Sequence, residues 1–166
     1  MIPFNVPLNI GSEETFLKKA ISYKYLSGDS RFCVECEDWI KNLTGAKEAF
    51  FVPSCTAALE MAALLINIQP GDEVIMPSFT FVSTANAFAL RGAKVVFVDI
   101  DPRTMNLNPY LIENAITDKT KAIVPVHYAG LSCDMDVIMD VASKNNLYVV
   151  EDAAQGLMSR FKDKYL

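Results

Sequence analysis

Hydrophobic and polar positions follow two rhythms along the chain. Short apolar runs rich in Val, Ile and Phe predict β-strands, and the longer amphipathic stretches between them predict helices. This alternation is typical of stacked βαβ units. The expected strands are residues 48–52, 73–76, 94–99, 121–127 and 147–151. The expected helices are residues 12–23, 31–43, 56–66, 83–90, 109–115 and 134–144.

Several of the predicted strands are apolar throughout rather than at every second position. Val95-Val96-Phe97-Val98 shows this continuous form, which indicates strands covered by helices on both faces and therefore a mostly parallel sheet. The predicted fold class is α/β, with three α/β/α layers. We expect two parts, an N-terminal helical arm over residues 1–45 and an α/β domain over residues 46–166.

Composition narrows the classes of function. The chain has 166 residues, 51% of them hydrophobic, which is enough for a sizeable core. Its net charge of -5 comes from 15 basic and 20 acidic residues, and the basic ones are scattered, so we expect no nucleic-acid partner and no membrane partner. No basic segment precedes an apolar run at the N-terminus, so we expect a cytoplasmic protein.

Two of the four cysteines have the spacing of a redox dithiol or half of a zinc site. They lie in Cys33-Val34-Glu35-Cys36, inside the predicted helix 31–43. No second pair of this kind exists, and His127 is the only histidine. We therefore predict no metal site and expect reduced, packed cysteines.

The predicted strand 147–151 ends on two adjacent carboxylates, Glu151 and Asp152. Successive side chains of a strand point to opposite faces, so only one of the two acids can face a ligand beyond the strand end. Parallel sheets bind ligands at that edge. From this segment alone, Asp152 either faces a ligand or caps a following helix.

Other strand ends place further chemistry at the same edge. Ser54, Cys55 and Thr56 open a helix, where they either bind a phosphate or serve as an ordinary helix cap. The aromatic residues of 77–81 either stack on a planar ligand or pack in the core. His127 lacks a neighbouring nucleophile motif, so a structural role is favoured over a catalytic one.

Neither a dinucleotide motif, GxGxxG, nor a P-loop, GxxxxGK[ST], is present. A phosphate cradle, a stacking ring and an acid together describe a site for pyridoxal 5′-phosphate (PLP). An acid beside the pyridine nitrogen keeps it protonated, so that the ring can accept electrons from a substrate carbon.

Several segments together resemble the DegT-type, PLP-dependent nucleotide-sugar aminotransferases of the fold-type I superfamily. The N-terminal pattern of residues 2–5 and the Gly28-Asp29 loop resemble members that act on dTDP-linked 4-keto-6-deoxyhexoses. The segments that carry the family resemblance are Pro53-Ser54-Cys55-Thr56-Ala57-Ala58-Leu59, Gly71-Asp72-Glu73-Val74-Ile75-Met76-Pro77-Ser78-Phe79-Thr80-Phe81, Pro125-Val126-His127-Tyr128-Ala129-Gly130 and Val150-Glu151-Asp152-Ala153-Ala154-Gln155.

The resemblance assigns roles to individual residues. It implies that Asp152 pairs with the pyridine nitrogen, that Gln155 reaches the phenolic oxygen region and that Phe81 stacks on the ring. It further implies that the phosphate is bound by Cys55, Thr56 and Ala57, and that the nucleotide sugar lies near the loop holding Tyr25, Gly28 and Asp29.

The implied reaction transfers an amino group, with glutamate as the expected donor, to the 4-keto carbon of a dTDP-sugar in polysaccharide antigen synthesis, in a homodimer. Family members hold PLP as a Schiff base on a lysine, and Lys162 and Lys164 in the polar segment 160–164 are poor candidates for it. We therefore expect the N-terminal part of a longer enzyme, with this lysine and a small domain beyond Leu166 and no turnover by this part alone. The alternatives are a sugar dehydratase of the same family, which has histidine in place of the lysine, and a non-catalytic interaction module.

Overall fold

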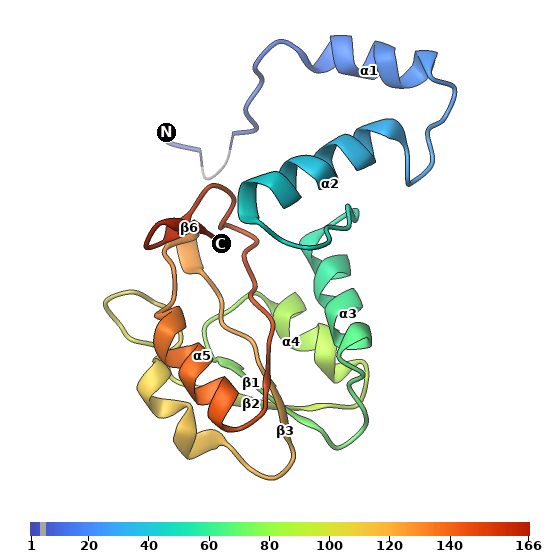
Figure 1. Cartoon of the computed structure of the whole chain (residues 1–166). Helices are drawn as coiled ribbons and strands as arrows, with labels where there is room; N and C mark the ends of the chain where they lie inside the picture. Colours follow the sequence, from blue (N-terminus) through green and yellow to red (C-terminus); the bar gives the residue numbers. More distant parts are fainter. Residues whose placement is uncertain (4–5) are drawn as a thin grey trace. The chain divides into compact units, whose positions relative to one another are not determined.

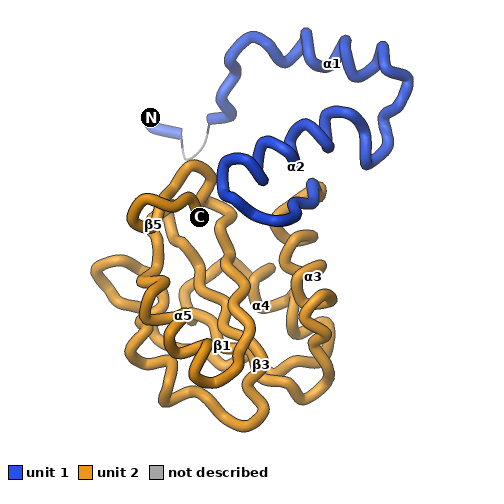
Figure 2. Tube along the Cα trace, in the orientation of Figure 1, with its two compact units in different colours: residues 1–51 blue, residues 52–166 orange. Residues whose placement is uncertain are grey.

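The computed structural model describes the whole chain except residues 4–5, so Phe4 and Asn5 of the N-terminal pattern lie outside the described residues. The chain forms two compact units, Met1–Phe51 and Val52–Leu166. Figure 2 shows them in different colours. The division falls a few residues after the one expected at 45/46.

The first unit contains two helices, as the apolar pattern predicts. They are α1 (Glu13–Ser22) and α2 (Arg31–Thr44). Helix α2 ends at Gly45, whose φ of 74° lies in the left-handed region that glycine adopts without a steric penalty. Cys33 and Cys36 are free thiols on α2 and are partly buried.

The second unit is built on a parallel sheet of order β2-β1-β3-β4. Its strands are β1 (Glu73–Pro77), β2 (Lys94–Val98), β3 (Thr120–Ile123) and β4 (Tyr148–Val149). The expected strand over residues 48–52 is wrong. No strand among the described residues pairs with that segment, and an extended segment becomes a strand only through hydrogen bonds to a neighbour.

Helices cover both faces of this sheet. Helices α3 (Cys55–Leu65) and α4 (Val82–Ala89) lie on one side and α5 (Met135–Lys144) lies on the other (Figure 1). Along β1, Val74 and Met76 pack with Phe88 of α4, whereas Ile75 packs with Ile138 of α5. Both faces of the strand are therefore buried, which confirms the three-layer α/β/α fold and explains the continuous apolar runs.

Some local features differ from the expected elements or add to them. Residues 109–115 form two short 3-10 turns, η1 (Pro109–Leu111) and η2 (Glu113–Ala115), rather than one helix. Strand β3 ends at Ile123, and beyond it only Val126 forms an isolated bridge, with Asp152. The polar segment 160–164 falls in a small hairpin of β5 (Arg160–Phe161) and β6 (Lys164–Tyr165).

Candidate cofactor site

A cavity of about 390 Å³ opens in the second unit where β1 and β3 end, a size typical of small-molecule sites. It is formed by the segments that follow β1, β3 and β4 together with the first turn of α3. The lining residues are Cys55, Thr56, Leu59, Phe79, Thr80, Phe81, Ser83, Thr84, Val126, His127, Tyr128, Asp152, Ala154 and Gln155. The structure thus brings together five of the six residues that the sequence assigned to the cofactor.

Asp152 is the buried acid of this cavity, with 6% of its surface exposed. Its Oδ2 accepts a hydrogen bond from Thr84 Oγ1 at 2.7 Å, and its Oδ1 accepts from the Ala154 N–H at 3.2 Å and from Cys55 Sγ at 3.6 Å. Turns rather than a helix follow it, so the helix-cap interpretation is wrong. No Lys, Arg or His in the described part of the chain forms an ion pair with this carboxylate.

Thr84 supports Asp152 and was not anticipated from the sequence. Its side chain is fully buried on the first turn of α4, and its hydroxyl lies 2.8 Å from that of Thr80. The Thr84 hydroxyl donates its one proton to Asp152 and therefore must accept from Thr80. No local pattern of the sequence places Thr84 beside Asp152, because the contact joins residues 68 positions apart.

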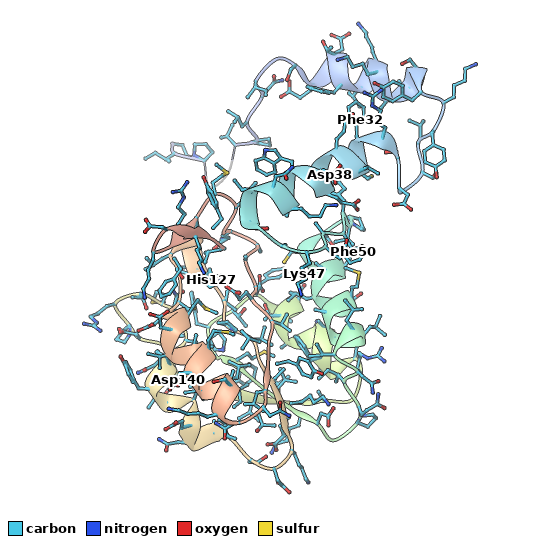
Figure 3. The ribbon with its side chains drawn as sticks, in the orientation of Figure 1. Phe32, Asp38, Lys47, Phe50, His127 and Asp140 are labelled. Atoms are coloured by element: carbon cyan, nitrogen blue, oxygen red, sulfur yellow. The ribbon has the colours of Figure 1, made fainter. Side chains whose placement is uncertain are left out.

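Glu151 points away from Asp152, as the alternation along a strand predicts. Its Oε2 lies 2.8 Å from His127 Nε2, and the Cys133 N–H donates to His127 Nδ1 at 3.1 Å. Nδ1 is therefore an acceptor, and Nε2 carries the proton that bonds Glu151. The side chain of His127, labelled in Figure 3, is completely buried. These contacts hold the strand end that carries Asp152.

The first turn of α3 provides the groups expected for a phosphate. Helix α3 begins at Cys55, and the backbone N–H groups of Cys55 and Thr56 in its first turn have no partner within the helix. Thr56 Oγ1 donates to Ser83 Oγ at 3.0 Å, which joins the first turn of α3 to that of α4. The N–H of Ala57 instead donates to the Ser54 side chain at 3.1 Å, and Ala57 does not line the cavity, so its phosphate contact stays a prediction.

Cys55 is a neutral thiol in this setting. Burial, together with the negative charge of Asp152, raises the pKa of its thiol to about 11. The protonated sulfur can therefore donate to Asp152 near neutral pH.

Of the two aromatic residues after β1, one is already engaged. Phe79 packs edge-on against Tyr128, with ring centroids 4.9 Å apart. Phe81 lines the cavity with 73% of its surface exposed. An exposed ring at a cavity wall is suited to stacking on a flat ligand, which agrees with the role that the resemblance implies for Phe81.

Gln155 is oriented by the turn after β3. Its Oε1 accepts from the Ala129 N–H at 2.7 Å. The side-chain NH₂ group is therefore the donor that Gln155 has left for a ligand.

The residues expected near a nucleotide sugar lie in the first unit. Tyr25, Gly28 and Asp29 belong to the loop between α1 and α2, and Asp29 has a left-handed φ of 62°. The cavity belongs entirely to the second unit. Their substrate contact stays a prediction.

No lysine is among the described side chains that line the cavity. Lys162 forms an ion pair with Asp136 of α5, which raises the pKa of its ammonium group and weakens it as a nucleophile. Within the described residues, no group of three or more His, Cys, Asp or Glu side chains is placed to hold a metal ion. No helix of the described chain is both long enough and apolar enough to cross a membrane.

Comparison with known proteins places these observations in a family. The family model of the DegT/DnrJ/EryC1/StrS aminotransferases matches residues 14–166. The chain is 42% identical, over 93% of its length and 42% of the relative's, to the GDP-perosamine synthase of Caulobacter vibrioides. It is 48% identical, over 78% of its length and 36% of the relative's, to the UDP-2-acetamido-2-deoxy-3-oxo-D-glucuronate aminotransferase of Pseudomonas aeruginosa.

Solved structures show the same likeness. An aminotransferase from Psychrobacter cryohalolentis superposes with a TM-score of 0.93 at 35% identity, over 99% of this chain and 42% of the other. NtdA from Bacillus subtilis, with bound cofactor PMP (pyridoxamine 5′-phosphate), superposes with a TM-score of 0.86 at 30% identity. The match covers 98% of this chain and 39% of the other. The chain thus spans about two fifths of the length of these proteins.

Proposed function

Because this chain belongs to the DegT/DnrJ/EryC1/StrS aminotransferase family, which is PLP-dependent, we propose that it forms the cofactor-binding part of a nucleotide-sugar aminotransferase. The observation that carries the proposal is Asp152, a buried carboxylate at the cavity with no cationic partner among the described residues. A buried carboxylate is costly unless a positive charge or strong donor faces it. The protonated nitrogen of a pyridine ring supplies both.

The other residues of the cavity fit the remaining parts of the cofactor. The first turn of α3 offers the N–H donors of Cys55 and Thr56 and the positive end of a helix dipole to a phosphate. Phe81 presents a free ring face, and Gln155 presents an NH₂ donor. The residues present therefore fit PLP. In addition, the sequence contains neither a dinucleotide motif nor a P-loop, which would have indicated another ligand.

When bound, the cofactor supplies an electron-accepting ring for deprotonation of a substrate carbon. Asp152 would hold a proton on the ring nitrogen, and the hydrogen bonds from Thr80 to Thr84 and from Thr84 to Asp152 would keep its carboxylate in place. The exposed ring of Phe81 would cover one face of the cofactor ring. We propose that the lysine that binds PLP covalently in this family is supplied from outside these 166 residues, since no lysine among the described residues lines the cavity.

For the substrate, we propose a dTDP-linked 4-keto-6-deoxyhexose, with glutamate as the amino donor. The support is the resemblance of the N-terminal segment and of the loop with Gly28 and Asp29. Relatives named for GDP and UDP sugars make the nucleotide the first property to test. The name of the UDP-sugar relative, an aminotransferase, favours amino transfer over dehydration. A homo-oligomer and a cytoplasmic location stay predictions.

Binding to this chain tests the cofactor proposal directly. Pyridoxamine 5′-phosphate (PMP) is the better ligand, because it lacks the aldehyde that reacts with surface lysines. We expect saturable PMP binding by calorimetry and a loss of affinity of about tenfold or more in Asp152→Asn, which keeps the shape but removes the charge. Equal affinity of the two proteins would contradict the role of Asp152.

Activity tests the substrate proposal. We expect the whole protein that contains this chain to form a 4-amino sugar from glutamate and a dTDP-linked 4-keto-6-deoxyhexose. Parallel assays with GDP- and UDP-linked 4-keto sugars identify the nucleotide preference by kcat/KM. Release of water without amino transfer would favour the dehydratase instead.

A further inference from the structure

Asn106 is a buried polar residue outside the cavity, with 3% of its surface exposed. It lies in the segment between β2 and η1, and its backbone is held there by Asp101 and Thr104. No sequence motif points to it. A buried amide must satisfy its donors and acceptors, so its two side-chain contacts show what it holds.

Both contacts go to a single turn, at its two ends. Asn106 Oδ1 accepts from the Tyr128 N–H at 2.9 Å, and Asn106 Nδ2 donates to the Leu131 carbonyl at 2.8 Å. The side chain therefore spans residues 128–131, the turn that follows β3. We call these residues the 128–131 turn.

The 128–131 turn needs such support, because its central backbone is unusual. Ala129 has φ 52° and ψ 24°, and Gly130 has φ 78°, so two successive residues lie in the left-handed region. This conformation is unfavourable for Ala129 and persists only where surrounding contacts impose it.

The 128–131 turn also lies against the segment that carries Gln155. A Cβ on Gly130 would lie 2.9 Å from the Gln155 carbonyl oxygen and 2.8 Å from Ser159 Oγ. Next to it, the Ala129 N–H donates to Gln155 Oε1 at 2.7 Å. The left-handed Ala129 thus directs its N–H at the Gln155 amide and fixes which end of that amide remains free.

We propose that Asn106 is a positioning residue, which holds the 128–131 turn so that the Ala129 N–H orients the Gln155 amide toward the cofactor. The contact between Gln155 and the cofactor rests on the proposed function. The link from Asn106 through the turn to Gln155 does not. Asn106 acts through the turn and touches no ligand.

Amide hydrogen exchange of the 15N-labelled chain tests the link without any cofactor. In Asn106→Ala we expect the Ala129 amide to exchange about tenfold faster, as in Gln155→Ala. Gln155→Ala removes the acceptor of that amide, whereas Asn106→Ala frees the two ends of the turn that directs the Ala129 N–H at Gln155. The Val124 amide, which donates to Ile75 in the sheet, reports whether the fold is intact. Asn108→Ala is the matched control, since Asn108 caps the nearby Tyr110 N–H and does not contact the turn.

PMP affinity in a double-mutant cycle tests the cofactor end. We expect Asn106→Ala and Gln155→Ala each to weaken PMP binding by about fivefold, and the double variant to be no weaker than Gln155→Ala alone. Additive losses, or Ala129 exchange unchanged in Asn106→Ala, would overturn the proposal. If the original chain does not bind PMP, the proposed function fails. The hydrogen-exchange rate of the Ala129 amide still decides the role of Asn106.

Discussion

At the scale of single residues, the side chains around Asp152 matter most. Thr84 is the only hydroxyl among the described residues that donates to Asp152 Oδ2, and it is fully buried. In Thr84→Val we expect a loss of about 1–3 kcal/mol of unfolding free energy, because a valine of equal size leaves the carboxylate oxygen without its donor. Urea unfolding measures this loss. Thr84→Ser keeps the hydroxyl and removes the methyl group. If it loses as much unfolding free energy as Thr84→Val, the hydrogen bond is not the cause of the loss.

Cys55 gives a second residue-scale test, in its reaction with an alkylating reagent. Burial is the main cause that raises the pKa of its thiol to about 11, and Asp152 adds to it. Only the thiolate reacts, so the rate should rise with pH towards about pH 11. In Asp152→Asn the pKa should fall, because the neighbouring negative charge no longer disfavours the thiolate. Mass spectrometry of the Cys55 peptide measures the rate, and an unchanged pH profile in the variant would contradict the contact.

At the scale of elements, Glu73 connects strands at the edge of the sheet opposite the cavity. It begins β1, and its carboxylate accepts from Lys94 Nζ of β2 at 2.8 Å and from Thr117 Oγ1, just before β3, at 2.6 Å. These hydrogen bonds lower the pKa of the Glu73 carboxyl below its ordinary value of 4.5. The bond from Lys94 is the larger cause, and the bond from Thr117 is the second.

A pKa that is lower in the folded than in the unfolded chain gives stability above the unfolded pKa. That stability is lost as the pH falls through the lowered folded value. We therefore expect the urea midpoint of the original chain to exceed that of Glu73→Gln at pH 7, and the difference to shrink below about pH 4.5. A difference that is constant from pH 7 to pH 3 would show that the charge of Glu73 contributes nothing.

The turn after β3 gives a second test at this scale. In Gly130→Ala we expect a loss of about 1–3 kcal/mol, from the left-handed backbone and from the collision of the new Cβ with Ser159 and Gln155. Gly71→Ala is the matched control. Gly71 also has positive φ, but a Cβ there meets nothing within 4 Å, so it should lose only the backbone component of about 1 kcal/mol. Chemical unfolding compares the two, and equal losses would argue against the close approach.

At the scale of the whole molecule, the cavity gathers segments far apart in the sequence within one unit. Cys55, Phe81, His127 and Asp152 come from four separate segments, and they meet because the carboxyl ends of parallel strands lie at one edge of the sheet. The strand pattern was enough to predict this edge, and five of the six residues to which the family resemblance gives a cofactor role line the cavity there.

The sequence alone determined the fold class, the positions of most helices and strands, and the acid at the cavity. These follow from local periodicity and from the rule that ligands bind at strand ends, neither of which needs coordinates. The expected strand at residues 48–52 was wrong, because local periodicity is not enough to make a strand. Its pattern is local, but a strand requires a partner, and no strand among the described residues pairs with it.

Only the tertiary structure decided which side chains support the site. Thr84 and Asn106 are ordinary polar residues in the sequence, and their roles arise from contacts with Asp152, 68 positions away, and with Leu131, 25 positions away. The same holds for Gln155, whose amide is oriented by a backbone N–H at Ala129. A hydrogen bond depends on distances and directions that folding sets between distant segments, so no local pattern could reveal these contacts.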